Sequence, residues 1–271
     1  MKHLLLAFFS LVLFSCETAK TNTELNSCKD NALAEVIYLD VYKQSQIYLN
    51  LFLSKQSPSD TAIKFISTAN PNSIAFPFVL TVQFGNKDLL GSDNKFRRGA
   101  MILTVNAASY DGTMLSIDQL DVTFEDFYLN QSNVLGTITL VNNGKNTKNN
   151  YSFNLNVSKG IVINSNGTMS WESLKTLEMT AGASTRSNIL DDTYLLSGSA
   201  SGKDFKLTDY STNIATPMTI DPNCRWFMSA GITTVEPNNL DVRSVNYGVA
   251  GSCSGQVQVQ IKEQSLNFSM Q

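Results

Sequence analysis

Four cysteines and one histidine are the residues of this 271-residue chain whose side chains support the widest range of chemistry. The cysteines are Cys16, Cys28, Cys224 and Cys253, and the histidine is His3. A cysteine can carry a lipid, form a disulfide or act as a nucleophile, and the last role usually needs a neighbouring base such as histidine. The positions of these residues therefore decide which chemistries the chain can perform.

Cys16 ends an apolar run from Leu4 to Phe14 that follows Lys2 and His3. The run is shorter than the roughly 20 residues that a membrane-spanning helix needs, but it has the length of the apolar core of a secretory signal. Its end, LFSC, resembles the bacterial lipobox, in which the cysteine receives a diacylglyceryl group and the chain is cut just before it. We expect residues 1–15 to be a signal peptide and Cys16 to be the lipidation site. The alternative is an ordinary signal peptide with an unrelated cysteine.

The residues after Cys16 indicate where the anchored protein resides. Residue 17 is Glu, not the Asp that often marks retention at an inner membrane, so we expect a lipid-anchored protein of the outer membrane, facing the periplasm or the cell exterior. Two or three acyl chains hold a protein stably on a membrane. The segment 16–29 is mostly polar and cannot build a core, so it is expected to be a tether.

Removal of the signal peptide would also remove His3 and leave a mature chain without histidine. Ser-His-Asp and Cys-His catalysis and histidine-ligated metal sites are then excluded. The spacing of the acidic residues Asp191, Asp192, Asp204 and Asp209 matches no regular calcium loop. The sequence therefore predicts no catalytic residue, no metal site and no cofactor, and we expect a protein that is not an enzyme.

Carboxylates are the remaining candidates for acid–base chemistry, and they are densest at Asp118, Asp121, Glu125 and Asp126. A pair of facing carboxylates could hydrolyse a glycosidic bond. Neighbours in a regular strand point to opposite faces, so Glu125 and Asp126 are not expected to form such a pair. A solvated surface is the preferred interpretation of this cluster.

Three other side chains are candidates for ligand binding. Trp171, flanked by Ser170 and Glu172, is the tryptophan more suited to exposure, where it could stack on a sugar, although a half-buried position is the simpler interpretation. Arg97 and Arg98 lie in a polar stretch before a strand and could hold an anionic ligand. Ion pairs with Asp88 or Asp93 would account for both arginines without any ligand.

The elements that position these residues are predicted from the spacing of apolar side chains. Residues 30–52 repeat apolar positions every three or four residues, which predicts a helix that packs on a sheet. Residues 61–263 alternate apolar and polar side chains between polar turns, which predicts successive antiparallel hairpins, and Asn166-Gly167 is the strongest hairpin signal. We expect a single domain over 30–271, mainly all-β, with one N-terminal helix and an antiparallel meander forming a sandwich or a rolled, curved sheet.

Cys224 and Cys253 are expected to form a disulfide. They lie at nearly equal distances from the turn at Pro237–Leu240, so an antiparallel hairpin around that turn would place them opposite each other. An exported protein resides where disulfides persist. Cys28 is then left over, either free or bonded to another chain.

Several segments between residues 75 and 263 follow one another in the order seen in a family of uncharacterised lipoproteins common in Bacteroidota-type bacteria, which the chain resembles. The resemblance implies secretion, a lipid anchor and a β-rich domain, and it implies no reaction. Members often carry another cysteine pair in the stretch that corresponds to 60–91, where this chain has none. The segments are SDNKFRRGAMILTV, VLGTITLVNNGKN, GTMSW, DDTYLLSGSASG, NCRWFMSAGI and NYGVAGSCSGQVQVQI.

The expected function is that of an outer-membrane-anchored or surface-exposed lipoprotein with a non-enzymatic structural, adhesive or ligand-binding role. The alternatives are an envelope glycan hydrolase that uses a carboxylate pair, and a lipid or lipoprotein carrier with an apolar groove. The expected partners are the membrane, through the N-terminal lipid, and a glycan or another envelope protein. A net charge of −3 without a basic run gives no reason to expect nucleic acid as a partner.

Overall fold

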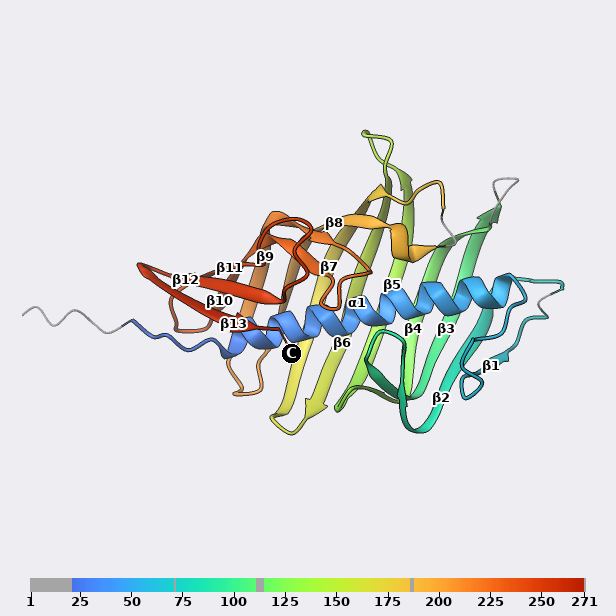
Figure 1. Ribbon diagram of the computed structural model, residues 1–271, viewed down its shortest axis with the longest axis horizontal. Helices are drawn as coiled ribbons and strands as arrows, with labels where there is room; N and C mark the ends of the chain where they lie inside the picture. Colours follow the sequence, from blue (N-terminus) through green and yellow to red (C-terminus); the bar gives the residue numbers. More distant parts are fainter. Residues whose placement is uncertain (1–20, 71, 111–114, 186–187, 271) are drawn as a thin grey trace, which may run out of the picture.

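The computed structural model describes residues 21–70, 72–110, 115–185 and 188–270. One long helix, α1 (Asn26–Leu53), lies across a broad antiparallel sheet (Figure 1). In the described residues thirteen strands form this sheet in chain order, each paired with the next, and the sheet is not closed. The predicted fold class, a mainly β meander in a curved sheet with one N-terminal helix, is confirmed. The strands are β1 (Lys64–Ser67), β2 (Phe78–Leu90), β3 (Phe96–Tyr110), β4 (Leu115–Leu129), β5 (Ser132–Lys145), β6 (Tyr151–Asn164), β7 (Gly167–Ala181), β8 (Thr193–Lys203), β9 (Asp209–Ile220), β10 (Met228–Pro237), β11 (Arg243–Asn246), β12 (Gln256–Ile261) and β13 (Gln264–Ser269), with a short 3-10 helix, η1 (Ile189–Asp191), before β8.

The strand boundaries differ from the predicted ones at three places. Alternation in the sequence predicts separate strands at 204–211 and 216–220, but a single strand, β9, covers residues 209–220, and residues 204–208 form the turn before it. The sheet continues past residue 263, since β13 adds one further strand. The hairpin predicted at Asn166-Gly167 joins β6 to β7, with Ser165 and Asn166 as its turn residues and Gly167 already in β7.

The helix begins at Asn26, four residues before the predicted start, so the last residues assigned to the tether are helical. Of its 28 residues, 20 are buried, and they lie on every side of the helix. A helix on a flat sheet would bury one stripe only. Here the sheet curves around α1, and the β12–β13 hairpin folds over its N-terminal half (Figure 1).

The curvature has an identifiable cause in the backbone. The register shifts by a residue or more in most hairpins between β2 and β10, and these irregular positions lie in a row that crosses the sheet. Such bulges bend a strand and increase its twist. The residues with positive φ along this row are Gly85, Gly99, Asp126, Gly136, Lys159, Gly198 and Gly231.

The core fills the space between α1 and the concave face of the sheet. Tyr38 of α1 stacks on Trp171 of β7, with ring centroids 5.2 Å apart. The interior cavity beside this pair holds only about 10 Å³. The concave face therefore contains the helix and has no room for a larger ligand there.

Candidate functional site

Trp171 is a core residue, which corrects the prediction that it is exposed or half-buried. Its side chain is 2 % exposed, and its indole Nε1 donates a hydrogen bond of 2.9 Å to Oδ1 of Asn31. The flanking Ser170 and Glu172 do lie at the surface, as alternation in β7 requires. The sequence pattern could not show that the apolar face of this strand is covered by α1, so Trp171 is unavailable to a sugar.

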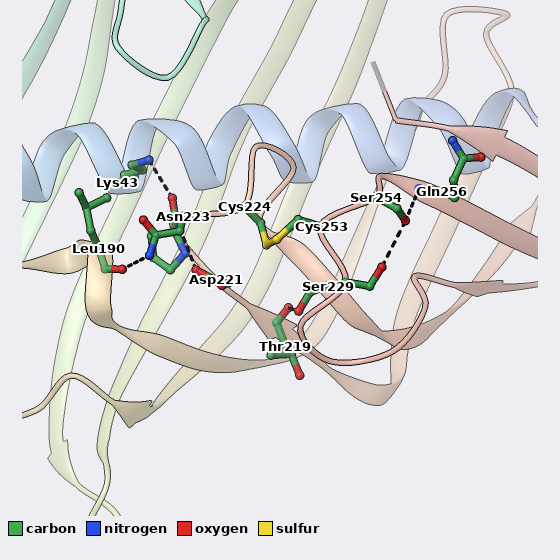
Figure 2. The surroundings of a disulfide bond; sticks show 12 residues. Lys43, Leu190, Thr219, Asp221, Asn223, Cys224, Ser229, Cys253, Ser254 and Gln256 are labelled. Carbon is green, nitrogen blue, oxygen red and sulfur yellow. Dashed lines mark hydrogen bonds between the residues drawn. A yellow bond between two sulfur atoms is a disulfide. The ribbon is translucent and has the colours of Figure 1, made fainter.

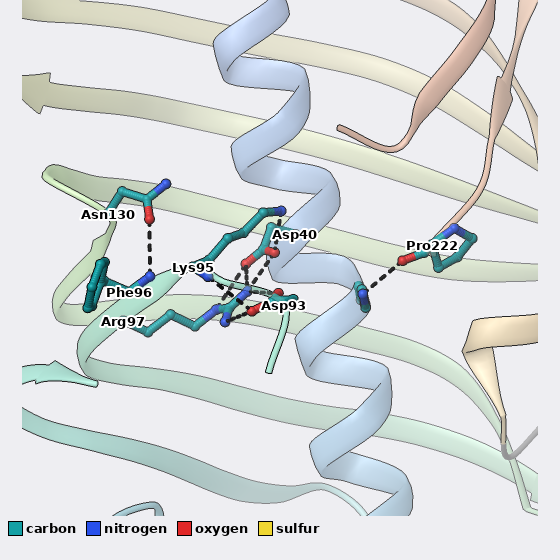
Figure 3. Close-up of polar contacts among 8 residues, drawn as sticks. Asp40, Asp93, Lys95, Phe96, Arg97, Asn130 and Pro222 are labelled. Atoms are coloured by element: carbon teal, nitrogen blue, oxygen red, sulfur yellow. Dashed lines mark hydrogen bonds and ion pairs between the residues drawn. The ribbon is translucent and has the colours of Figure 1, made fainter. Parts of the chain in front are cut away.

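Arg97 is also buried, and it binds a carboxylate of α1 instead of an external anion. Its guanidinium forms a bidentate pair with Asp40 of α1, with Nη2 2.7 Å from Oδ1 and Nε 3.1 Å from Oδ2. Asp93 binds the same group, as the sequence suggested, with Oδ2 2.6 Å from Nη2. Figure 3 shows these side chains together with Lys95, whose Nζ lies 2.9 Å from Asp40 Oδ1.

In this cluster of Asp40, Asp93, Lys95 and Arg97, the surroundings of Asp93 and Arg97 favour the charged forms of these two residues. Burial alone would lower the pKa of Arg97, but Asp40 and Asp93 outweigh it and raise that pKa above its usual range. Burial opposes the ionisation of Asp93, yet the bond to Arg97 and its charge hold the pKa of Asp93 below its usual value. The cluster is therefore a structural anchor for α1, and the sequence missed it because Asp40 lies 57 residues away from Arg97.

A second buried ion pair fixes the N-terminal half of the helix. Nζ of Lys175 on β7 lies 2.5 Å from Oε1 of Glu35, and both side chains are at most 3 % exposed. Near the middle of α1, Lys43 donates a hydrogen bond of 2.8 Å to the carbonyl of Pro222. Buried charges are costly unless they are paired, so these contacts specify one position for the helix.

Cys224 and Cys253 form the predicted disulfide, with their Cα atoms 5.2 Å apart. It joins the loop between β9 and β10 to the loop between β11 and β12 (Figure 2). The turn at Pro237–Leu240 lies where the sequence placed it, and β10 pairs with β11 around it. Cys28 is free and 1 % exposed, and burial raises the pKa of its thiol to about 12. The predicted signal peptide, residues 1–15, and the predicted lipidation site, Cys16, lie outside the described residues.

Arg98 lines an open depression on the surface of the sheet. This depression has a volume of about 590 Å³ and lies on the outer face of β2, β3 and β4. The guanidinium of Arg98 lies 3.5 Å from the centre of the Tyr128 ring, and its Nη1 is 2.7 Å from Asp88 Oδ1, the partner suggested by the sequence. Arg98 therefore already has an aromatic partner in Tyr128 and an ionic partner in Asp88.

Glu125 and Asp126 line the same depression, which corrects the prediction that they point to opposite faces. Asp126 has a φ of +46°, and Gly99 lies against it with a φ of +80°. This bulge interrupts the alternation, so both carboxylates are exposed on one face. Only Gly99 gave a signal in the sequence, because a glycine inside a strand pattern often marks a bulge.

A groove between α1 and β13 is another sizeable opening in the described part of the chain. It has a volume of about 490 Å³, and its walls come from the first turns of α1, from the β6–β7 and β8–β9 turns and from β13. Phe205, Phe268 and Met270 form apolar parts of its wall, and Lys29 and Lys206 lie at its exposed rim. The sequence did not indicate this groove, because β13 was not among the predicted strands.

Comparison of the chain with models of known protein families, with curated proteins and with solved structures finds no significant match. Within the part of the chain that the structure describes, no helix has the length and apolar character needed to cross a membrane. The site must therefore be interpreted from its own geometry.

Proposed function

We propose that this chain is an outer-membrane-anchored or surface-exposed lipoprotein that binds a glycan or another envelope protein on its exterior and catalyses no reaction. The lipobox at Cys16 and the resemblance to uncharacterised lipoproteins of Bacteroidota-type bacteria support the anchor. The location of the binding surface is inferred from α1, whose residues are buried on every side of the helix. The helix therefore fills the concave face of the sheet and leaves no space there for a ligand. Binding must then use outer surfaces such as the groove beside β13.

The two alternative functions fit this geometry less well. A lipid or lipoprotein carrier needs an apolar groove, whereas the concave face contains a helix fixed by the ion pairs of Asp40 and Glu35. A glycan hydrolase needs one carboxyl group in a buried environment so that it stays protonated near neutral pH. Glu125 and Asp126 share a depression, but both are exposed.

The anchor is tested by changing Cys16 to Ser in the native bacterium. Wild-type protein should be found in the outer-membrane fraction, and mass spectrometry of its N-terminal peptide should show acylated Cys16 as residue 1. The C16S protein should lose the lipid and be absent from the outer-membrane fraction. A matched C28S variant should stay anchored, because Cys28 is a buried thiol of the fold. Outer-membrane localisation of C16S, or an unmodified cysteine in the wild type, would contradict the proposal.

Protease treatment of intact cells then decides between the two orientations. Release of peptides from the described domain would show that it faces the medium, and full protection would place it in the periplasm. Either result is compatible with an anchored binding protein.

A further inference from the structure

The groove beside β13 is built like a site for one added strand. Four consecutive residues of β13 and its end, Asn267 to Met270, line the groove. The side chains of consecutive strand residues point to opposite faces of the sheet. Four consecutive residues can therefore line one groove only if the groove runs along the backbone edge of the strand. The opposite wall is a face of α1 formed by Asn26, Lys29, Asp30, Leu33 and Val36, which recur every three or four residues.

The backbone of β13 is unpaired on that side. Ile261 and Gln264 close the two-residue turn of the β12–β13 hairpin, so Gln264, Leu266 and Phe268 direct their N–H and C=O groups toward β12. Ser265, Asn267 and Ser269 direct theirs away from β12. In the described residues β13 has no other strand neighbour.

This edge also lacks the usual protection of sheet edges. Natural edge strands are shortened, charged, interrupted by proline or bulged, because open edges recruit further strands. The other edge, β1, has four residues and starts with Lys64. In contrast, β13 has six residues, QSLNFS, without charge or proline, and its register with β12 is regular.

Two lysines lie at the rim of the groove, and one of them, Lys206, is close enough to Asp30 to interact with it electrostatically. Lys29 and Lys206 are exposed, and neither forms an ion pair with another described residue. Lys29 also lies in the first turn of α1, where positive charge is unfavourable for the helix dipole. Asp30 is the acidic residue of the lining, but it is 9 % exposed and its Oδ2 accepts a hydrogen bond from the N–H of Phe205. The charged groups that an acidic partner can reach at the rim are therefore the two lysines.

The size of the groove fits a single strand. With strands about 4.8 Å apart, sheets about 10 Å thick and a rise of about 3.3 Å per residue, each added residue fills about 160 Å³. A groove of about 490 Å³ then holds about three residues. A second copy would have to bring the whole β12–β13 hairpin, for which there is no room beside α1.

We propose that an extended peptide segment with acidic side chains binds in this groove as an additional strand along β13. The backbone of Asn267 and Ser269 pairs with the peptide, as in other cases of strand addition. Alternate side chains of the peptide pack on Phe205, Phe268 and Met270, and the remaining acidic ones reach Lys29 and Lys206. This assignment deepens the proposed binding role and does not depend on the lipid anchor.

The test is a titration of the purified protein with two fluorescent peptides, Glu-Val-Glu-Val-Glu and Lys-Val-Lys-Val-Lys, both capped at their ends. The acidic peptide should bind at least tenfold more tightly than the basic one. The double variant K29E/K206E should reverse this preference. K64E/K87E, which reverses two exposed charges away from the groove, should leave it unchanged.

The strand geometry is tested by Asn267→Pro. The N–H of Asn267 points away from β12, so proline removes a donor only from the added strand. N267P should keep the thermal midpoint of the wild type and weaken binding of the acidic peptide at least tenfold. Absent binding, equal affinity for both peptides, or undiminished binding by a folded N267P would overturn the proposal. A dimer in sedimentation that N267P abolishes would overturn it as well, because a second copy would then occupy the edge.

Discussion

Asp192 is a buried carboxylate at the end of η1 whose two oxygens have different surroundings. Its Oδ2 accepts a hydrogen bond from the hydroxyl of Tyr194, which in turn accepts one from Tyr42 of α1. Its Oδ1 is buried and finds no hydrogen-bond partner among the described residues. Burial raises the pKa of Asp192 to about 6, and the neighbouring Asp191 adds to this, although the bond to Tyr194 lowers it. The charged form of Asp192 therefore costs the fold stability at neutral pH.

Asp192→Asn should make the protein more stable at pH 7.5, by about 1–3 kcal/mol. The folded state binds the proton of Asp192 more tightly than the unfolded state, so this group adds stability as the pH falls from above 6 to about 4. The advantage of D192N should therefore shrink over that range and vanish near pH 4. Urea denaturation at several pH values measures this. Burial also raises the pKa of Asp30 to about 6. Asp30 makes the same pH-dependent contribution to stability in the wild type and in D192N, so it cancels in the comparison. An advantage of D192N that does not change with pH would contradict this account.

Asp40 is the residue on which the attachment of α1 depends most. Asp40→Asn leaves Lys95 and Arg97 buried with incomplete partners, and breaking a buried pair in this way costs about 3–5 kcal/mol. The matched control is Asp88→Asn, which breaks the exposed pair with Arg98. Chemical denaturation should show a large loss for D40N and no measurable shift for D88N. Equal stability of the two variants would show that the Asp40 cluster does not anchor the helix.

At the scale of elements, the row of bulges explains how an open sheet wraps a helix. Gly85 and Gly99 provide a matched pair, because their φ values are +83° and +80°. A Cβ at Gly85 would meet no atom within 4 Å, whereas one at Gly99 would lie 2.1 Å from the carbonyl oxygen of Asp126. Gly85→Ala should cost about 1–2 kcal/mol for the left-handed backbone. Gly99→Ala should cost about 1–3 kcal/mol more because its neighbour must move.

The same denaturation experiment decides whether these bulges are needed. If G99A is no less stable than G85A, the close contact between β3 and β4 is not a constraint on the sheet. If it is less stable, the curvature that surrounds α1 depends on glycine at this position.

The elements also show which structural features a sequence reveals. Local alternation and turn residues were enough to predict the meander, the turn at Pro237–Leu240 and the Cys224–Cys253 bond, because each depends on residues close to one hairpin. The alternation of Leu266, Phe268 and Met270 would have predicted β13 as well. The burial of Trp171, the shared face of Glu125 and Asp126, and the Asp40–Arg97 pair could not be predicted in this way. They depend on bulges and on the path of a helix that is distant in sequence.

In the molecule as a whole, α1 already occupies the interior of the curved sheet. Because α1 closes the concave face, the proposed binding uses the outer face of the sheet and its β13 edge. Binding at these outer surfaces requires that α1 stays in place in the folded protein. If the helix could leave while the sheet remained folded, an apolar groove of the kind that carriers use would open.

Native-state hydrogen exchange of the α1 amides tests this requirement most directly. The buried ion pairs of Glu35 and Asp40 and the wrapping of the sheet make the helix part of the cooperative core. The account predicts that amides in the middle of α1 exchange only by global unfolding, with the same opening free energy as those of β5 and β6. Exchange of the α1 amides through an opening of clearly lower free energy, while β5 and β6 stay protected, would contradict it.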